Sequence, residues 1–93
     1  MIGSPEAVLY TRRDCPLCHV LSRLAGRSAR RHRVGLREVD VDGDAALRAR
    51  YGDRVPVLEI PGASPLAAGS AARDVDAAFE RAAALRGTGG GTA

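Results

Sequence analysis

A short apolar run at residues 7–11 (AVLYT) most constrains the fold, because it leads directly into a segment with helical periodicity. The run is rich in β-formers and lies between Pro5 and a charged triplet, which is typical of a buried central strand. From Pro16 onward, apolar residues recur every three or four positions and predict a helix over residues 16–31. The expected core face of that helix consists of Leu17, Leu21, Leu24 and Ala25. A second strand at residues 34–41 follows, and the order strand, helix, strand predicts a parallel, right-handed crossover.

A short helix and a hairpin are expected next. Asp42 is a candidate cap for a helix over residues 44–51, which Gly52 would end. Residues 55–60 (VPVLEI) and 64–68 flank a Pro-Gly turn and predict an antiparallel pair of strands at a sheet edge.

The last periodic segment, residues 74–86, predicts a helix with Asp74 as its cap. Its expected inward face consists of Val75, Phe79, Ala82 and Leu85. The order β-α-β-α-β-β-α predicts an α/β domain in which a mixed four-stranded sheet is flanked by helices.

The length of 93 residues allows one small domain, which we place at residues 1–86, followed by a flexible Gly-rich tail at 87–93. Hydrophobic residues make up 45% and charged residues 27%, an ordinary balance for a globular protein. No apolar run approaches the roughly 18 residues of a membrane helix, and the N-terminus lacks the pattern of a signal peptide. We therefore expect a cytoplasmic protein without a membrane partner.

The net charge of +3 does not indicate nucleic-acid binding. The densest basic cluster is GRSARRHR at residues 26–33, but every basic residue of the chain is Arg, which indicates a bias in composition. Only three aromatic residues exist, too few for a base-stacking platform. We expect the arginines to lie on a solvated helix end.

The only two cysteines, in Cys15-Pro16-Leu17-Cys18-His19, allow three interpretations. A c-type haem matches the pattern, but it is attached after export and needs a second axial ligand. A structural zinc site needs a second pair of ligands, which this chain does not supply in the usual spacing. The third interpretation is a redox-active dithiol.

The predicted local structure favours the dithiol. Pro16 is suited to the first position of a helix, which makes Cys15 its N-cap. Unpaired N–H groups and the helix dipole stabilise a thiolate at such a site and can lower a thiol pKa from about 8.5 to about 3.5–7.5. Cys15 is therefore the candidate nucleophile, and Cys18, one turn later, is the candidate resolving thiol. We expect no metal at this pair.

A second feature of the site lies at Val55-Pro56, at the entry to the third strand. We hypothesise that this bond is cis and faces the cysteines, so that the backbone of Val55 pairs with an extended substrate.

With these features, the chain resembles the glutaredoxins of the thioredoxin superfamily, and most of all their small bacterial glutaredoxin-like relatives. The likeness rests on AVLYT, RRD, CPLC, EVDVD and RVPVLEI. It implies a thioredoxin-like fold, the roles given above for Cys15 and Cys18, a cis-proline at Pro56, and Arg12 near the carboxylate of glutathione. The glycine pair and acidic residue with which glutaredoxins hold the γ-glutamyl end of glutathione have no clear counterpart in residues 67–72.

The sequence thus predicts a monomeric thiol-disulfide oxidoreductase acting on protein or low-molecular-weight disulfides. Its candidate substrate-binding residues are Arg12, Pro16, Val55 and Pro56. No bound cofactor is expected, and glutathione or another low-molecular-weight thiol is the candidate co-substrate. The alternative is a binding module of the same fold that holds a metal or an iron–sulfur cluster through the same cysteines. The physiological substrate and the reductant do not follow from the sequence.

Overall fold

The computed structural model describes the backbone of residues 5–91 and the side chains of residues 5–85. Its elements follow the expected order, with one added 3-10 turn. They are β1 (Glu6–Thr11), α1 (Pro16–His32), β2 (Gly35–Asp40), η1 (Val41–Gly43), α2 (Ala45–Tyr51), β3 (Val57–Glu59), β4 (Leu66–Ala67) and α3 (Ala72–Gly91). None of the described helices is long and apolar enough to cross a membrane.

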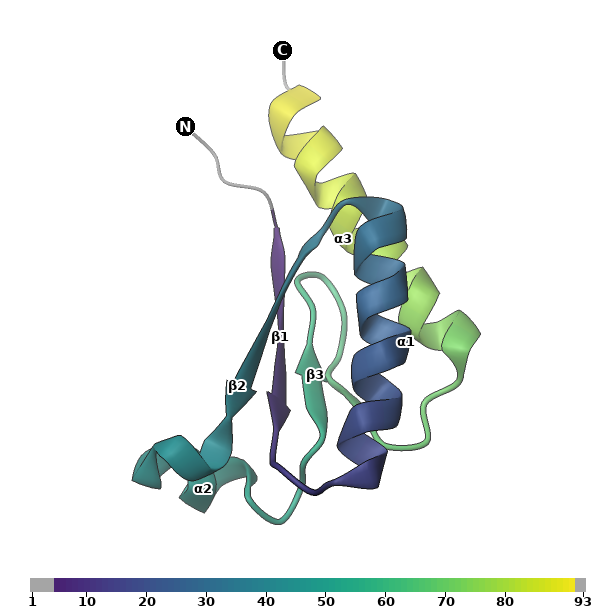
Figure 1. Ribbon diagram of the computed structural model, residues 1–93. Coiled ribbons are helices and arrows are strands. Elements are labelled where there is room, and N and C mark those ends of the chain that lie inside the picture. Colours follow the sequence, from purple (N-terminus) through teal and green to yellow (C-terminus); the bar gives the residue numbers. More distant parts are fainter. Residues whose placement is uncertain (1–4, 92–93) are drawn as a thin grey trace.

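The four strands form one mixed sheet in the order β2-β1-β3-β4, with β1 inside it (Figure 1). β1 pairs in parallel with β2, which confirms the crossover through α1. It pairs antiparallel with β3, so that Tyr10 lies opposite Val57, and β3 pairs antiparallel with β4. This register places the chain that enters β3 beside the end of β1. The predicted α/β thioredoxin-like architecture is therefore confirmed.

The larger core lies between the sheet and the helices α1 and α3. Ala7 and Leu9 alternate with outward residues on β1 and are fully buried, as period-two strand geometry requires. Phe79 of α3 is also fully buried, and a side chain of this size contributes about 1.5–3 kcal/mol by burial. This core fixes α1, and with it the position of the cysteines.

A smaller core on the other face joins α2 to the sheet. It consists of Val41, Tyr51 and Val57, with Tyr10 packed against it. The rings of Tyr10 and Tyr51 stack with centroids 4.1 Å apart, and the Tyr51 hydroxyl donates a hydrogen bond of 3.0 Å to Glu59. Burial, together with this hydrogen bond, raises the pKa of Tyr51 above its ordinary value. α2 thus covers only one end of this face.

Asp76 connects α3 to α1. Its Oδ1 atom lies 3.1 Å from Ser28 Oγ, which donates to it, and 3.0 Å from His32 Nε2. Partial burial raises the pKa of Asp76, but the hydrogen bonds with His32 and Ser28 and the charge of Arg31 lower it more, so that the pKa lies below its ordinary value.

The structure corrects the expected cap of the second helix. Asp44, not Asp42, caps α2, and its Oδ1 atom accepts a hydrogen bond of 3.0 Å from the N–H of Leu47. The cause is the 3-10 turn η1, which Asp40 caps and which occupies residues 41–43. Asp42 is thereby left free for a different contact, described below.

Three expectations for the last helix were also wrong. α3 begins at Ala72, so Asp74 lies in its first turn and not at its cap. Leu85 is exposed, whereas Val75, Phe79 and Ala82 are buried as expected. α3 continues to Gly91, beyond the expected end at residue 86. Residues 92–93 of the expected tail lie outside the described residues, and the flexibility of the tail stays a prediction.

Candidate active site

The site begins where β1 ends and the chain turns into α1. Asp14 takes a left-handed conformation with φ of 51°, which Asp tolerates better than most residues. Cys15 follows in an extended conformation at the N-cap of α1, and Pro16 is the first residue of the helix. The predicted helix start is thus confirmed, and it holds the Cys15 side chain at the unpaired N–H groups of the first turn.

Cys15 and Cys18 are joined by a disulfide, with their Cα atoms 5.2 Å apart. The backbone N–H of Cys18 points at the Cys15 sulfur, with 3.1 Å between nitrogen and Sγ. The two cysteines differ in exposure, because Cys18 is fully buried and Cys15 is only half-buried. A molecule in solution can therefore reach the sulfur of Cys15 more easily than that of Cys18.

Apolar side chains next to the sulfurs face solvent. Leu17 is 58% exposed and Val20 is 47% exposed, and Pro16 is exposed as well. The expected core position of Leu17 was wrong, because the first turn of α1 lies at the end of the sheet, where no strand covers it (Figure 1). Both residues border the site, but the helical period assigned Leu17 to the core and gave no assignment to Val20.

The Val55–Pro56 bond is cis, as hypothesised from the sequence. Pro56 is fully buried directly before β3, and the pairing of Tyr10 with Val57 places it beside the end of β1. Val55 is half-buried, and its backbone N–H and C=O make no hydrogen bond with the described residues. These backbone groups are free to pair with another chain.

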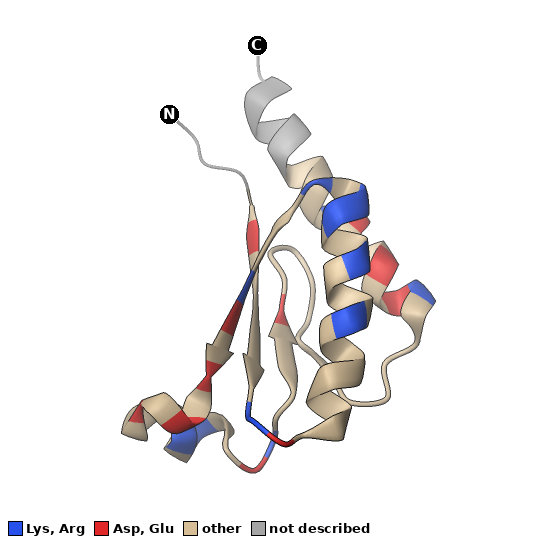
Figure 2. Cartoon of the chain, in the orientation of Figure 1, with Lys and Arg blue, Asp and Glu red and all other residues tan. Residues whose placement is uncertain are grey.

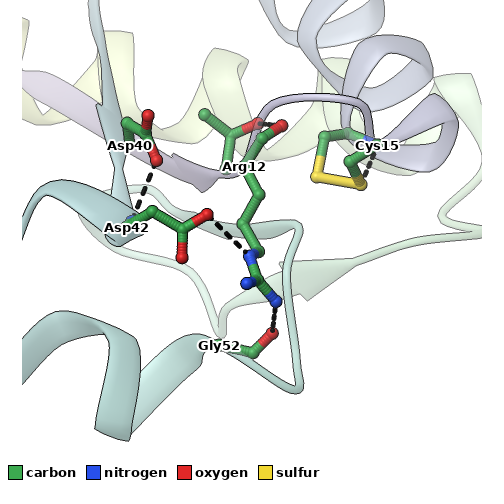
Figure 3. A network of polar contacts seen from close by, with 7 residues as sticks. Arg12, Cys15, Asp40, Asp42 and Gly52 are labelled. Carbon is green, nitrogen blue, oxygen red and sulfur yellow. Dashed lines mark hydrogen bonds and ion pairs between the residues drawn. A yellow bond between two sulfur atoms is a disulfide. The ribbon is translucent and has the colours of Figure 1, made fainter.

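Arg12 connects the end of β1 to the chain that precedes Pro56 (Figure 3). Its Nε atom donates to Asp42 Oδ2 at 3.0 Å, and its Nη1 atom donates to the carbonyl of Gly52 at 3.2 Å. The hydrogen bond and the negative charge of Asp42 raise the pKa of Arg12 further. The guanidinium thus has two acceptors within the protein, and its role toward a substrate stays a prediction. Neither acceptor was foreseen from the sequence.

A small polar cavity adjoins the same loop. It has a volume of about 190 Å³ and is lined by Thr11, Arg12, Arg13, His19, Glu38 and Asp40. His19, which completes the haem-like motif, is exposed at its edge. No group of three or more potential metal-ligating side chains occurs in the described part of the chain. The pair of Cys15 and Cys18, which forms a disulfide, is the redox-capable group of this site.

Comparisons with known proteins support the fold. The sequence profile of the family described as Glutaredoxin-like domain (DUF836) matches residues 6–81. A solved structure from X. campestris, Northeast Structural Genomics target protein XcR50, is 36% identical, with 81% of this chain and 96% of that chain covered and a TM-score of 0.59.

Two more distant structures share the fold. Thioredoxin O2 from Arabidopsis thaliana in its oxidized state is 20% identical, with 84% of this chain and 74% of that chain covered and a TM-score of 0.61. A malarial protein is 15% identical, with coverages of 85% and 97% and a TM-score of 0.63. No curated protein sequence matches the chain.

Proposed function

The chain belongs to the glutaredoxin-like domain family (DUF836), and from this premise we propose that it is a thiol-disulfide oxidoreductase that reduces protein or low-molecular-weight disulfides. The observation that carries the proposal is the asymmetry of the cysteine pair. Cys15 is half-buried at a helix N-cap with the N–H of Cys18 directed at its sulfur, whereas Cys18 is fully buried. One sulfur is accessible for attack on a substrate, and the other is protected for the second step.

The first step uses the reduced protein. The N–H of Cys18 and the N-terminus of α1 stabilise the thiolate of Cys15, which attacks one sulfur of the substrate disulfide. The substrate S–S bond breaks as the bond between Cys15 and the substrate forms. The departing substrate thiolate takes a proton from solvent.

In the second step, Cys18 loses its proton and attacks the Cys15 sulfur. The mixed disulfide breaks, the second substrate thiol is released, and the Cys15–Cys18 disulfide forms, which is the state in the structure. Two electrons have moved from the dithiol to the substrate. An external thiol or dithiol must return two electrons and two protons to complete the cycle, and glutathione or another low-molecular-weight thiol is our candidate.

The surface around Cys15 suits an extended substrate segment. The backbone groups of Val55, which have no hydrogen-bond partner among the described residues, can pair with it as an added strand. Pro16 and Leu17 offer apolar contact on the other side of the sulfur. Arg12 borders this surface while it holds the loop through Gly52.

Replacement of each cysteine by serine tests the proposal. With a reductant chosen from several thiols and disulfide reductases, the unaltered protein is expected to reduce insulin and a small dialkyl disulfide. Cys15→Ser should abolish this activity. Cys18→Ser should form a stable mixed disulfide on Cys15, visible by mass spectrometry of the intact protein, because the resolving thiol is absent.

A Ser22→Ala variant, which leaves both cysteines in place, serves as the control. Full activity in Cys15→Ser, or no reduction by the unaltered protein with any thiol, would refute the proposal. Stoichiometric metal in a purified dimer, lost in Cys15→Ser, would support the binding module instead.

A further inference from the structure

A basic groove lies along α1, on the side that faces β2. Its volume of about 830 Å³ exceeds that of the cavity beside the cysteines. Its charged lining consists of Arg23, Arg27, Arg30, Arg33 and Glu38. In Figure 2 the basic residues follow one another along α1 as successive blue bands. We call this feature the arginine groove.

Three of these arginines form a row of exposed, unpaired charge. Arg23, Arg27 and Arg30 are exposed, and none has an acidic partner among the described residues. They occupy successive turns of one helix, where like charges destabilise each other slightly. A negatively charged ligand would relieve this repulsion.

The floor and wall of the arginine groove suit a polypeptide. Ala29, Val34 and Leu36 add an apolar floor. Among the strands that the structure describes, β2 pairs only with β1, so its outer edge has backbone groups that another extended chain can pair with. Because the lining residues that the structure describes include no aromatic side chain, this part of the groove lacks the stacking surfaces that single-stranded nucleic acids use.

The spacing of charge also fits an extended chain. Four residues of a helix rise about 6 Å, which separates Arg23 from Arg27 along the axis. Alternate residues of a strand lie about 6.7 Å apart and point the same way. Acidic residues at every second position of an extended segment can therefore meet successive arginines.

The arginine groove is continuous with the surroundings of the dithiol. Glu38 lines both this groove and the small cavity that contains Arg13 and His19. His19 lies one helical turn before Arg23, and Cys15 one turn before His19. A chain bound in the groove would thus run toward the N-terminal end of α1, where Cys15 lies.

We propose that the arginine groove binds an extended, acidic segment of the disulfide-containing protein that this chain reduces. The proposal rests on the function proposed above, and it adds the substrate class: protein disulfides flanked by alternating acidic residues. Arg23, Arg27 and Arg30 are the residues that would select it.

Three synthetic peptides test this selection. Each begins with one terminal residue, which is followed by Thr alternating with Glu in the first peptide, with Lys in the second and with Gln in the third. For binding, the terminal residue is Ser and the peptide carries a fluorescent label read by anisotropy. For reduction, it is Cys in a mixed disulfide with a chromogenic thiol. The Glu peptide is expected to bind about tenfold more tightly than the Lys peptide at low salt, because a few exposed ion pairs can supply this difference. In the reduction assay, kcat/KM for the Glu peptide should exceed that for the Lys peptide by a similar factor.

Two variants of equal charge separate the groove from general electrostatics. The groove variant carries Arg23→Gln, Arg27→Gln and Arg30→Gln, and the control carries Arg48→Gln, Arg73→Gln and Arg81→Gln at exposed positions elsewhere. The groove variant should lose about tenfold in affinity for the Glu peptide, and the control should lose less than about twofold. Circular dichroism checks that both variants keep the fold.

The outcomes distinguish this inference from the function on which it rests. Equal affinity of the Glu peptide for the groove variant and the unaltered protein would overturn the inference. An oligothymidylate that bound through the same arginines more tightly than the Glu peptide would overturn it too, in favour of a nucleic-acid site. Reduction of all three peptides at equal rates would support the proposed oxidoreductase function and would overturn the inference that it selects acidic substrates. Selective binding of the Glu peptide with no reduction of any peptide would support the groove as a binding site for acidic segments and would refute the oxidoreductase function.

Discussion

Reduction of the disulfide should yield an unusually acidic thiol at Cys15, and the structure allows the size of the effect to be worked out. The N–H of Cys18 reaches the Cys15 sulfur, and the N-terminus of a 17-residue helix lies beside it. A hydrogen bond to a charged acceptor contributes about 1.5–3 kcal/mol, and a helix N-terminus about 0.3–1 kcal/mol. Together these contacts favour the thiolate by about 2–4 kcal/mol, so the thiolate of Cys15 should form at a clearly lower pH than that of a free cysteine.

The assay is the rate of iodoacetamide alkylation of the reduced Cys18→Ser variant as a function of pH. This variant keeps the backbone N–H at position 18 and leaves Cys15 as the only thiol. The midpoint of the rate profile is a better readout than the rate at one pH, because a more acidic thiolate is also a weaker nucleophile. A peptide of residues 12–18 with Ser at position 18 is the control, since it keeps the neighbouring charges without the folded helix. Midpoints within about 0.5 pH unit of each other would refute the argument that the helix start activates Cys15.

The remaining predictions concern stability. Phe79→Ala should lower the free energy of unfolding by about 3–5 kcal/mol in urea titrations, because it leaves a cavity in the larger core; a change below about 1 kcal/mol would contradict the packing described. Asp14→Ala should be about 1 kcal/mol less stable than Asp14→Gly, because both lose the carboxylate and only Ala keeps a Cβ at positive φ. Arg12→Ala and Asp42→Asn should each lower the melting temperature by a few degrees. The melting temperature of the double variant should be no lower than that of the less stable single variant; additive losses would show that the two side chains act separately. The lowered pKa of Asp76 contributes stability that is present above about pH 4 and is lost as the pH falls through the folded-state pKa, so acid titration should destabilise the unaltered protein more than Asp76→Asn.

The sequence predicted the elements that local signals determine. An apolar β-prone run, a proline at the first helical position and a Val-Pro pair at a strand entry act over a few residues, and each led to the observed structure. The parallel pairing of β1 with β2 was predicted because a strand-helix-strand unit typically forms a parallel crossover.

The features that failed depend on residues far apart in the chain. Asp42 and Asp44 are equally suitable caps by sequence, but the 3-10 turn η1 occupies residues 41–43 and leaves Asp44 to cap α2. Asp42 instead accepts a hydrogen bond from Arg12, thirty positions away. Leu17 fits the apolar period of α1, but a period does not show where the sheet ends. The role of Arg12 toward a substrate carboxylate stays a prediction of the family resemblance, and its two acceptors within the chain, Asp42 and Gly52, were not foreseen from the sequence.

The difference between the two cores has a consequence for how the site opens. α1, which carries both sulfurs, packs with α3 in the larger core, whereas α2 and the chain that follows it rest on Val41, Tyr51 and Val57. Local unfolding should therefore begin in α2, whose amide protons should exchange with solvent before those of α1. The site would then widen from the side of Val55 while Cys15 stays in place. Under the proposed function, a rigidly held Cys15 opposite a less stable segment would allow the site to accept disulfides from substrates of different shape.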